Sequence, residues 1–106
     1  MNIKIINRYK IKNTPNTIFC GRGSPLGNPF PINTFQGRDD VCESYIDWFN
    51  LNLRHPENIQ GFHKQLHTIE AMARKHPIIH LECYCAPKRC HCETIKKYIE
   101  DKIKED

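Results

Sequence analysis

The stretch IIHLECYCAPKRCHCETIKKYI, residues 78–99, decides the fold. It begins with β-branched residues and continues with alternating polarity, which predicts a strand over 78–85. In such a strand one face would carry Ile79, Leu81, Cys83 and Cys85. After a turn at Pro87, apolar residues recur at helical spacing from about Cys92 to Lys104. The inward-facing residues of this final helix would be Ile95, Tyr98, Ile99 and Ile103.

Two short β-prone runs, at 2–6 and 17–21, precede this unit and are separated by the turn-forming residues Asn13, Pro15 and Asn16. From Asp39, helical spacing of Val41, Tyr45, Trp48 and Phe49 predicts a helix that ends near Leu53. A second helix is expected to begin around Pro56, with Gly61 weakening its first turn. It would run to Pro77 and bury Ile59, Phe62, Leu66, Ile69 and Met72.

These elements predict a single small α/β domain over residues 1–106, with a short mixed or parallel sheet, flanking helices and the order β-β-α-α-β-α. The net charge of +4 favours anionic partners without requiring them. We find neither a signal peptide nor a run long enough to span a membrane, so we expect a cytoplasmic protein without a membrane partner. In that reducing compartment, clustered cysteines favour metal ligands or thiols over disulfides.

The segment GRGSPLGNPFPINTFQG, residues 21–37, holds four glycines and three prolines in seventeen residues and cannot propagate a helix. It follows a predicted strand, where ligand-binding loops of α/β proteins lie. Its glycines, including Gly23, permit a close backbone approach, while Arg22, Ser24 and Asn28 offer donors suited to phosphate. The alternative interpretation is a structural turn in which Phe30 fills the core.

Residues 83–92 concentrate cysteines in a C-x-C-x4-C-H-C pattern, which leaves several interpretations open. One is zinc, with the simplest ligand set being Cys83, Cys85, Cys90 and His91, and with Cys92 as a substitute. Another is a reactive thiol, since Cys90 would lie at a helix start beside His91 and two basic residues. That helix start would also suit an anion. The remaining alternative is a purely structural set of buried thiols.

The motifs together resemble the family named domain of unknown function 4326, known from bacteria and from viruses including phages. Its members carry a strand followed by GR-x-S-x-x-GNPF, then an R-x-x-V-x-x-Y-x-x-W/Y-like helix, then C-W-C-x-P-x-x-C-H-G-D near the C-terminus. The corresponding segments here are 21–30, the helix with Arg38, Val41, Tyr45 and Trp48, and 83–91. Two departures stand out: Cys92-Glu93 replaces the family's Gly-Asp, and Cys20 and Cys42 match no family cysteine. We therefore set Cys20 and Cys42 aside as site members.

The resemblance implies that Arg22, Ser24, Asn28, Cys83, Cys85, Cys90 and His91 belong to shared motifs. It leads us to expect that the glycine-rich loop and the cysteine-rich turn lie side by side and form one pocket. Arg38 joins the expected ligand-binding residues Arg22, Gly23, Ser24 and Asn28. The flat part of a ligand would lie near Phe30 or Tyr84.

The resulting expectation is a small accessory protein of phage or viral origin that binds a nucleotide or nucleic acid, with zinc as a possible cofactor. The first alternative is an enzyme of nucleotide or nucleic-acid modification that uses Cys90 and His91 as catalytic residues. The second is an interaction module for a host protein, in which the cysteines serve stability alone. The sequence shows no paired carboxylates suited to general acid–base catalysis, which counts against the enzyme interpretation.

Overall fold

The computed structural model describes residues 2–9, 15–30, 37–86 and 88–105. The predicted order β-β-α-α-β-α and the α/β fold class are confirmed. The elements are β1 (Asn2–Asn7), β2 (Thr17–Phe19), α1 (Arg38–Arg54), α2 (Phe62–Lys75), β3 (Ile78–Cys83) and α3 (Cys92–Lys104). Three parts of the sequence predictions lie outside the described residues, namely the turn residue Asn13, positions 31–36 of the glycine-rich loop, and Pro87.

The three strands form one parallel sheet in the order β1-β3-β2. β3 pairs with both neighbours, so that Ile5 of β1 and Ile18 of β2 both lie in register with Leu81. The sheet is therefore parallel rather than mixed. Because all three strands run the same way, their carboxyl ends meet at one edge of the sheet, where ligands of α/β proteins commonly bind.

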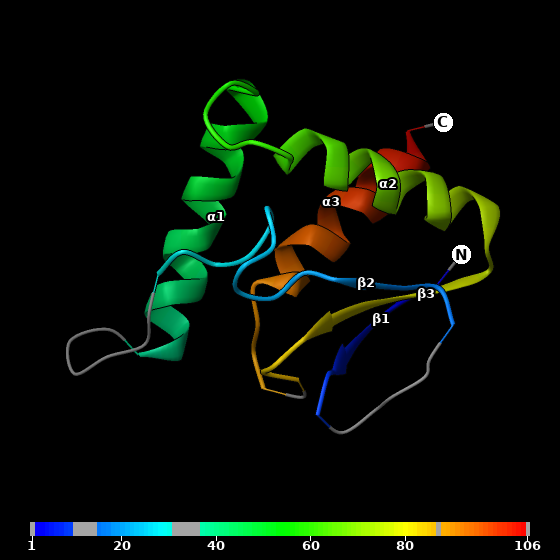
Figure 1. Cartoon of the computed structure of the whole chain (residues 1–106), viewed down its shortest axis with the longest axis horizontal. Coiled ribbons are helices and arrows are strands. Elements are labelled where there is room, and N and C mark those ends of the chain that lie inside the picture. The colour runs from blue at the N-terminus through cyan, green and yellow to red at the C-terminus, as the bar shows by residue number, and fades with distance from the viewer. Residues whose placement is uncertain (1, 10–14, 31–36, 87, 106) are drawn as a thin grey trace.

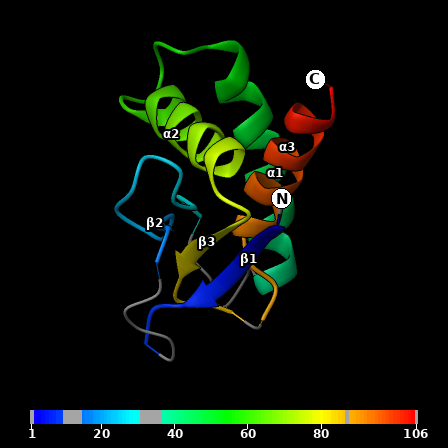
Figure 2. The ribbon, with the colours of Figure 1, turned by 90° about the vertical axis from the view of Figure 1, so that its right-hand side faces the viewer.

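Helices α2 and α3 lie over the same face of the sheet in both views (Figures 1 and 2). β3 accordingly alternates, since Ile79, Leu81 and Cys83 are buried completely while Ile78 on the outer face is 40% exposed. This is the alternation expected from the sequence. It identifies a core face toward the helices and an outer face away from them.

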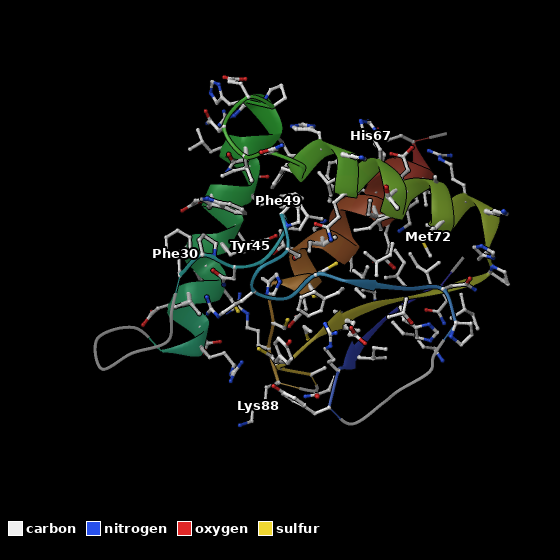
Figure 3. All side chains as sticks on the ribbon, in the orientation of Figure 1. Phe30, Tyr45, Phe49, His67, Met72 and Lys88 are labelled. Atoms are coloured by element: carbon white, nitrogen blue, oxygen red, sulfur yellow. The ribbon has the colours of Figure 1, made fainter. Side chains whose placement is uncertain are left out.

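The helix periodicities place the predicted residues in the core. Tyr45 and Phe49 point inward from α1 (Figure 3), and both are fully buried. Trp48 packs at the margin of the core, with its ring edge-on to Phe62 at 5.7 Å between centroids. Among the described residues, no helix combines the length and the apolar character needed to cross a membrane.

The predicted start of the second helix at Pro56 is wrong, because α2 begins at Phe62. Gly61, expected inside the first turn, lies just before the helix with φ of 84°, a left-handed conformation that an α-helix cannot contain. The backbone turns between His55 and Ile59 instead, where the Asn58 N–H donates to the His55 carbonyl at 3.0 Å.

Two strands end earlier than predicted. β2 ends at Phe19, because the Gly21 carbonyl accepts the Ser24 N–H at 3.0 Å and so begins a turn. β3 ends at Cys83 rather than Cys85, and the Cys85 carbonyl accepts the Lys88 N–H at 2.9 Å in the next turn. Cys85 therefore does not share the core face of β3 with Cys83.

Candidate functional site

A pocket of about 60 Å³ lies where the carboxyl ends of β2 and β3 meet the start of α1. Both segments expected to lie side by side, the glycine-rich loop and the cysteine-rich turn, contribute to its wall. The residues that line this pocket, called the arginine pocket below, are Gly21, Arg22, Asn28, Arg38, Val41, Cys42, Tyr84, Cys85, Arg89 and His91.

The polar side chains of the glycine-rich loop bind mainly the loop itself. Arg22 donates to the carbonyls of Asn28 at 2.5 Å and Phe30 at 2.7 Å, and the Ser24 hydroxyl donates to the Gly21 carbonyl at 2.7 Å. Asn28 donates to the Val41 carbonyl at 3.1 Å, which joins the loop to α1. Ser24 and Gly23, both predicted to contact a ligand, are not part of the pocket wall.

The loop is compact because two of its glycines touch. A Cβ at Gly27 would lie 2.4 Å from the Gly21 carbonyl oxygen, too close for any other residue. Gln65 of α2 holds the loop from the other side, donating to the Phe19 carbonyl at 2.8 Å and accepting the Leu26 N–H at 3.0 Å. Leu26, rather than Phe30, is the loop residue that fills the core.

Three arginines line the pocket, and their partners differ. Arg89 forms ion pairs with Asp39 at 3.0 Å and Glu43 at 2.7 Å, and the hydrogen bonds to these carboxylates raise its pKa. Arg38, the first residue of α1, donates to the Arg89 carbonyl at 3.2 Å. Within the described segments, neither Arg22 nor Arg38 has a carboxylate partner, so both retain uncompensated positive charge.

A second group of residues forms what we call the cysteine cluster, made of Cys83 at the end of β3 and Cys90 and Cys92 at the start of α3. Their three Sγ atoms all lie within 4.8 Å of one another, and all three side chains are buried. Backbone N–H groups point at two of these sulfurs, from Cys85 to Cys83 at 3.4 Å and from Cys92 to Cys90 at 3.5 Å. Such a set of soft donors could hold a metal ion.

The sulfurs of the cysteine cluster also interact with one another. Hydrogen bonds from the Cys90 and Cys92 thiols lower the pKa of Cys83, whereas hydrogen bonding with Cys83 raises the pKa of Cys90. Hydrogen bonding raises the pKa of Cys92. The largest contribution comes from Cys20, and smaller ones come from Cys83 and Cys90. The neighbouring thiols thus stabilise negative charge on Cys83, and a thiolate there would be a suitable electron-pair donor for a cation.

His91 lies between the arginine pocket and the cysteine cluster. Its Nε2 donates to the Cys20 carbonyl at 2.5 Å, and its Nδ1 lies 3.6 Å from the Cys90 sulfur. Burial lowers the pKa of His91, although the hydrogen bond to the Cys20 carbonyl and the charge of Cys83 oppose that shift. The lowered pKa favours the neutral ring, in which Nε2 carries the proton and Nδ1 keeps its lone pair.

The predicted metal ligands divide into two groups. Cys83, Cys90 and the substitute Cys92 come together, with His91 adjacent to two of them, whereas Cys85 faces the arginine pocket and is only partly buried. The strand pairing explains the difference, since β3 ends at Cys83 and the chain turns before Cys85.

At the start of α3, two of the N–H donors expected to bind an anion already have partners. The Glu93 carboxylate accepts the Cys90 N–H at 2.9 Å, and the Cys92 N–H points at the Cys90 sulfur. Glu93 thus places an acidic side chain in the first turn of α3, where the helix dipole favours it. Cys90 itself is only 3% exposed, has a raised pKa and is not part of the pocket wall, so its burial disfavours a role as a nucleophile.

Cys20 and Cys42, both set aside at the sequence level, lie at the site. The Cys20 carbonyl orients His91, and its thiol contacts Cys92, while Cys42 lines the arginine pocket. A signal for Cys42 was present, because it follows Arg38 by one helical turn and so shares its face of α1. A signal for Cys20 was its position at the carboxyl end of a strand.

Fold and site together define a small parallel α/β domain with a basic pocket at the carboxyl edge of its sheet and a buried cysteine cluster beside it. The chain belongs to the family described as Domain of unknown function (DUF4326), whose model matches residues 4–101. This match confirms the resemblance seen in the sequence motifs. None of the curated proteins and none of the solved structures compared with the chain matches it.

Proposed function

We propose that this protein binds a nucleotide or the end of a nucleic acid by holding a phosphate group in the arginine pocket. The observation that carries the proposal is the presence of Arg22 and Arg38 in one pocket wall, neither with a carboxylate partner within the described segments. An arginine guanidinium has five donors, and backbone carbonyls occupy only part of this set in Arg22 and Arg38. The remaining donors are suited to phosphate oxygens.

The size of the arginine pocket supports the same ligand chemistry. A cavity of about 60 Å³ has the volume of about two water molecules at about 30 Å³ each, so it suits a small group such as one phosphate. Its position at the carboxyl edge of a parallel sheet is the usual ligand site of α/β proteins. Arg89 adds positive charge to the wall, although Asp39 and Glu43 neutralise much of it.

Calorimetric titration with adenosine monophosphate tests this proposal. Arg38→Ala should weaken binding by roughly 10- to 100-fold, because a hydrogen bond to a charged group contributes about 1.5–3 kcal/mol. Arg54→Ala is the matched control, since Arg54 is exposed at the other end of the same helix and should bind as the wild type does. The proposal fails if the wild type binds no phosphate compound, or if both variants bind equally well.

We further propose that the cysteine cluster binds zinc through the sulfurs of Cys83, Cys90 and Cys92. His91 Nδ1, which lies beside Cys90 but not within reach of all three sulfurs, would supply a fourth ligand only after a shift of its ring. In tetrahedral zinc sites, sulfur and nitrogen ligands lie about 3.6 Å apart, and Cys90 Sγ lies 3.6 Å from His91 Nδ1. The hydrogen bond from Nε2 to the Cys20 carbonyl has the form that commonly orients a ligating histidine. The three sulfurs need to approach one another by at most about 1 Å to reach zinc–sulfur distances.

Elemental analysis of protein purified without added metal or chelator tests the zinc proposal. We expect about one zinc ion per chain, a large loss in Cys90→Ser, and retention in Cys85→Ser. Cys85 is the matched control because it belongs to the same sequence motif but lies outside the cluster. A folded, metal-free wild type would overturn the proposal and favour purely structural thiols, and zinc loss in Cys85→Ser would overturn the ligand set.

A further inference from the structure

The arginine pocket, at about 60 Å³, is much smaller than a whole nucleotide. If the proposed function holds, the rest of the ligand must therefore lie on the rim of the pocket. The chemistry of that rim then decides which class of phosphate compound binds. The inference that follows rests on the proposed function and names what the rim recognises.

Two tyrosines with exposed rings lie on this rim. Tyr84 lines the arginine pocket and is 40% exposed, and Tyr9 is 73% exposed. Their ring centroids are 5.0 Å apart with an angle of 35° between the planes. Phe19 supports Tyr84 from the side, edge-on at 5.5 Å. The three rings come from segments at the carboxyl ends of β1, β2 and β3, so they form a continuous aromatic surface beside the pocket.

Backbone contacts fix this aromatic surface in place. The buried side chain of Asn7 accepts the Tyr9 N–H at 2.8 Å and donates to the Tyr84 carbonyl at 3.1 Å. Gly21 lies under the rings, because a Cβ there would be 2.6 Å from Phe19 and 3.5 Å from Tyr84. The backbone of both tyrosines is therefore fixed beside the arginine pocket.

An arginine also lies on this surface. The Arg8 guanidinium lies 4.6 Å from the centre of the Phe19 ring, and it forms an ion pair with Glu82 at 3.7 Å that offsets part of its charge. Exposed aromatic rings combined with arginines are the features by which proteins stack nucleobases next to bound phosphates. Phe30, the other aromatic candidate from the sequence, is not part of the pocket wall.

We propose that Tyr9 and Tyr84 form a stacking subsite for a nucleobase whose phosphate occupies the arginine pocket. The ligand class is thus a nucleoside phosphate, either free or at the end of a strand, rather than a sugar phosphate or inorganic phosphate. Stacking accepts every base, because each has an aromatic face. The subsite therefore recognises a base without selecting its identity.

Calorimetric titrations with adenosine monophosphate, ribose 5-phosphate and a 5′-phosphorylated oligonucleotide test the subsite. The wild type should bind adenosine monophosphate roughly tenfold or more tightly than ribose 5-phosphate, given the usual contribution of base stacking. Tyr84→Leu should reduce this affinity ratio toward one, and Tyr84→Phe, which keeps the aromatic face, should preserve it. Tyr9→Leu, at a position more exposed than Tyr84, gives a second readout should Tyr84→Leu fold poorly.

The outcomes separate the subsite from the proposed function. Equal affinity for ribose 5-phosphate and adenosine monophosphate would overturn the subsite and leave phosphate binding intact. A wild type that binds none of the three compounds would overturn both. Tighter binding of the oligonucleotide than of the mononucleotide would identify a strand end as the source of the base, and weaker or equal binding would identify a free nucleotide.

Discussion

Asn7 is a buried amide whose hydrogen bonds join β1 to the cysteine-rich turn. It is 8% exposed, donates to the carbonyls of Tyr84 at 3.1 Å and Ala86 at 2.9 Å, and accepts the Tyr9 N–H at 2.8 Å. No other side-chain type of this size provides two donors and one acceptor. A single residue thus sets the position of both segments that carry the exposed tyrosines.

We predict that Asn7→Ala lowers the free energy of unfolding by about 1–3 kcal/mol, because it leaves buried backbone groups without partners. Asn7→Asp should destabilise at least as much, since a carboxylate cannot donate and would face two carbonyl oxygens. Chemical denaturation measures both effects. Asn50→Ala, at an exposed position on α1, is the control and should change stability by less than about 0.5 kcal/mol. An Asn7→Ala variant as stable as this control would contradict the prediction.

At the scale of elements, the start of α2 depends on the conformation of one glycine. Gly61 has φ of 84°, and its Cα faces the Pro25 ring of the glycine-rich loop, so a Cβ would lie 3.0 Å from Pro25 Cγ. The turn before α2 therefore packs against the loop that forms the arginine pocket. A helix starting at Pro56 would instead have placed Gly61 within a helical turn.

The direction in which Gly61→Ala changes the free energy of unfolding distinguishes these two arrangements. In the left-handed conformation, Gly61→Ala should lower the free energy of unfolding by about 1–2 kcal/mol, whereas in a helix interior it would raise stability by up to about 1 kcal/mol. Gly37→Ala is the matched control, because Gly37 has φ of −82° and open space at its Cβ position. Thermal or chemical denaturation of the two variants measures the difference in their free energies of unfolding. A Gly61→Ala variant more stable than the wild type would contradict the prediction.

At the scale of the whole molecule, local sequence patterns predicted the fold class. They did not predict which strands pair with one another or in which direction. Helical spacing correctly placed Tyr45 and Phe49 inside, because it depends only on neighbouring turns of one helix. Strand order and direction depend on pairing between distant segments, such as Asn2 with Ile78, which leaves no local trace. The sequence therefore left the sheet as mixed or parallel.

The candidate site shows the same division between local and distant information. The two motifs that form the arginine pocket were visible, but the use of Ser24 and Asn28 to bind the backbone was not, since these residue types serve ligands and turns alike. The predicted ligand set and the cysteine cluster differ at Cys85, because alternation was extended past the end of β3 to that residue. Cys92, the substitute, enters the cluster because α3 begins there.

The central position of β3 has a consequence for synthesis on the ribosome. β3 follows β1 and β2 in the chain, yet it is the strand with which both of them pair. During translation β1 and β2 therefore have no sheet partner until residues 78–83 have emerged. Until then their unpaired edges are open to other chains. The sheet, the arginine pocket at its carboxyl edge and the cysteine cluster then form together, late in the life of the nascent polypeptide.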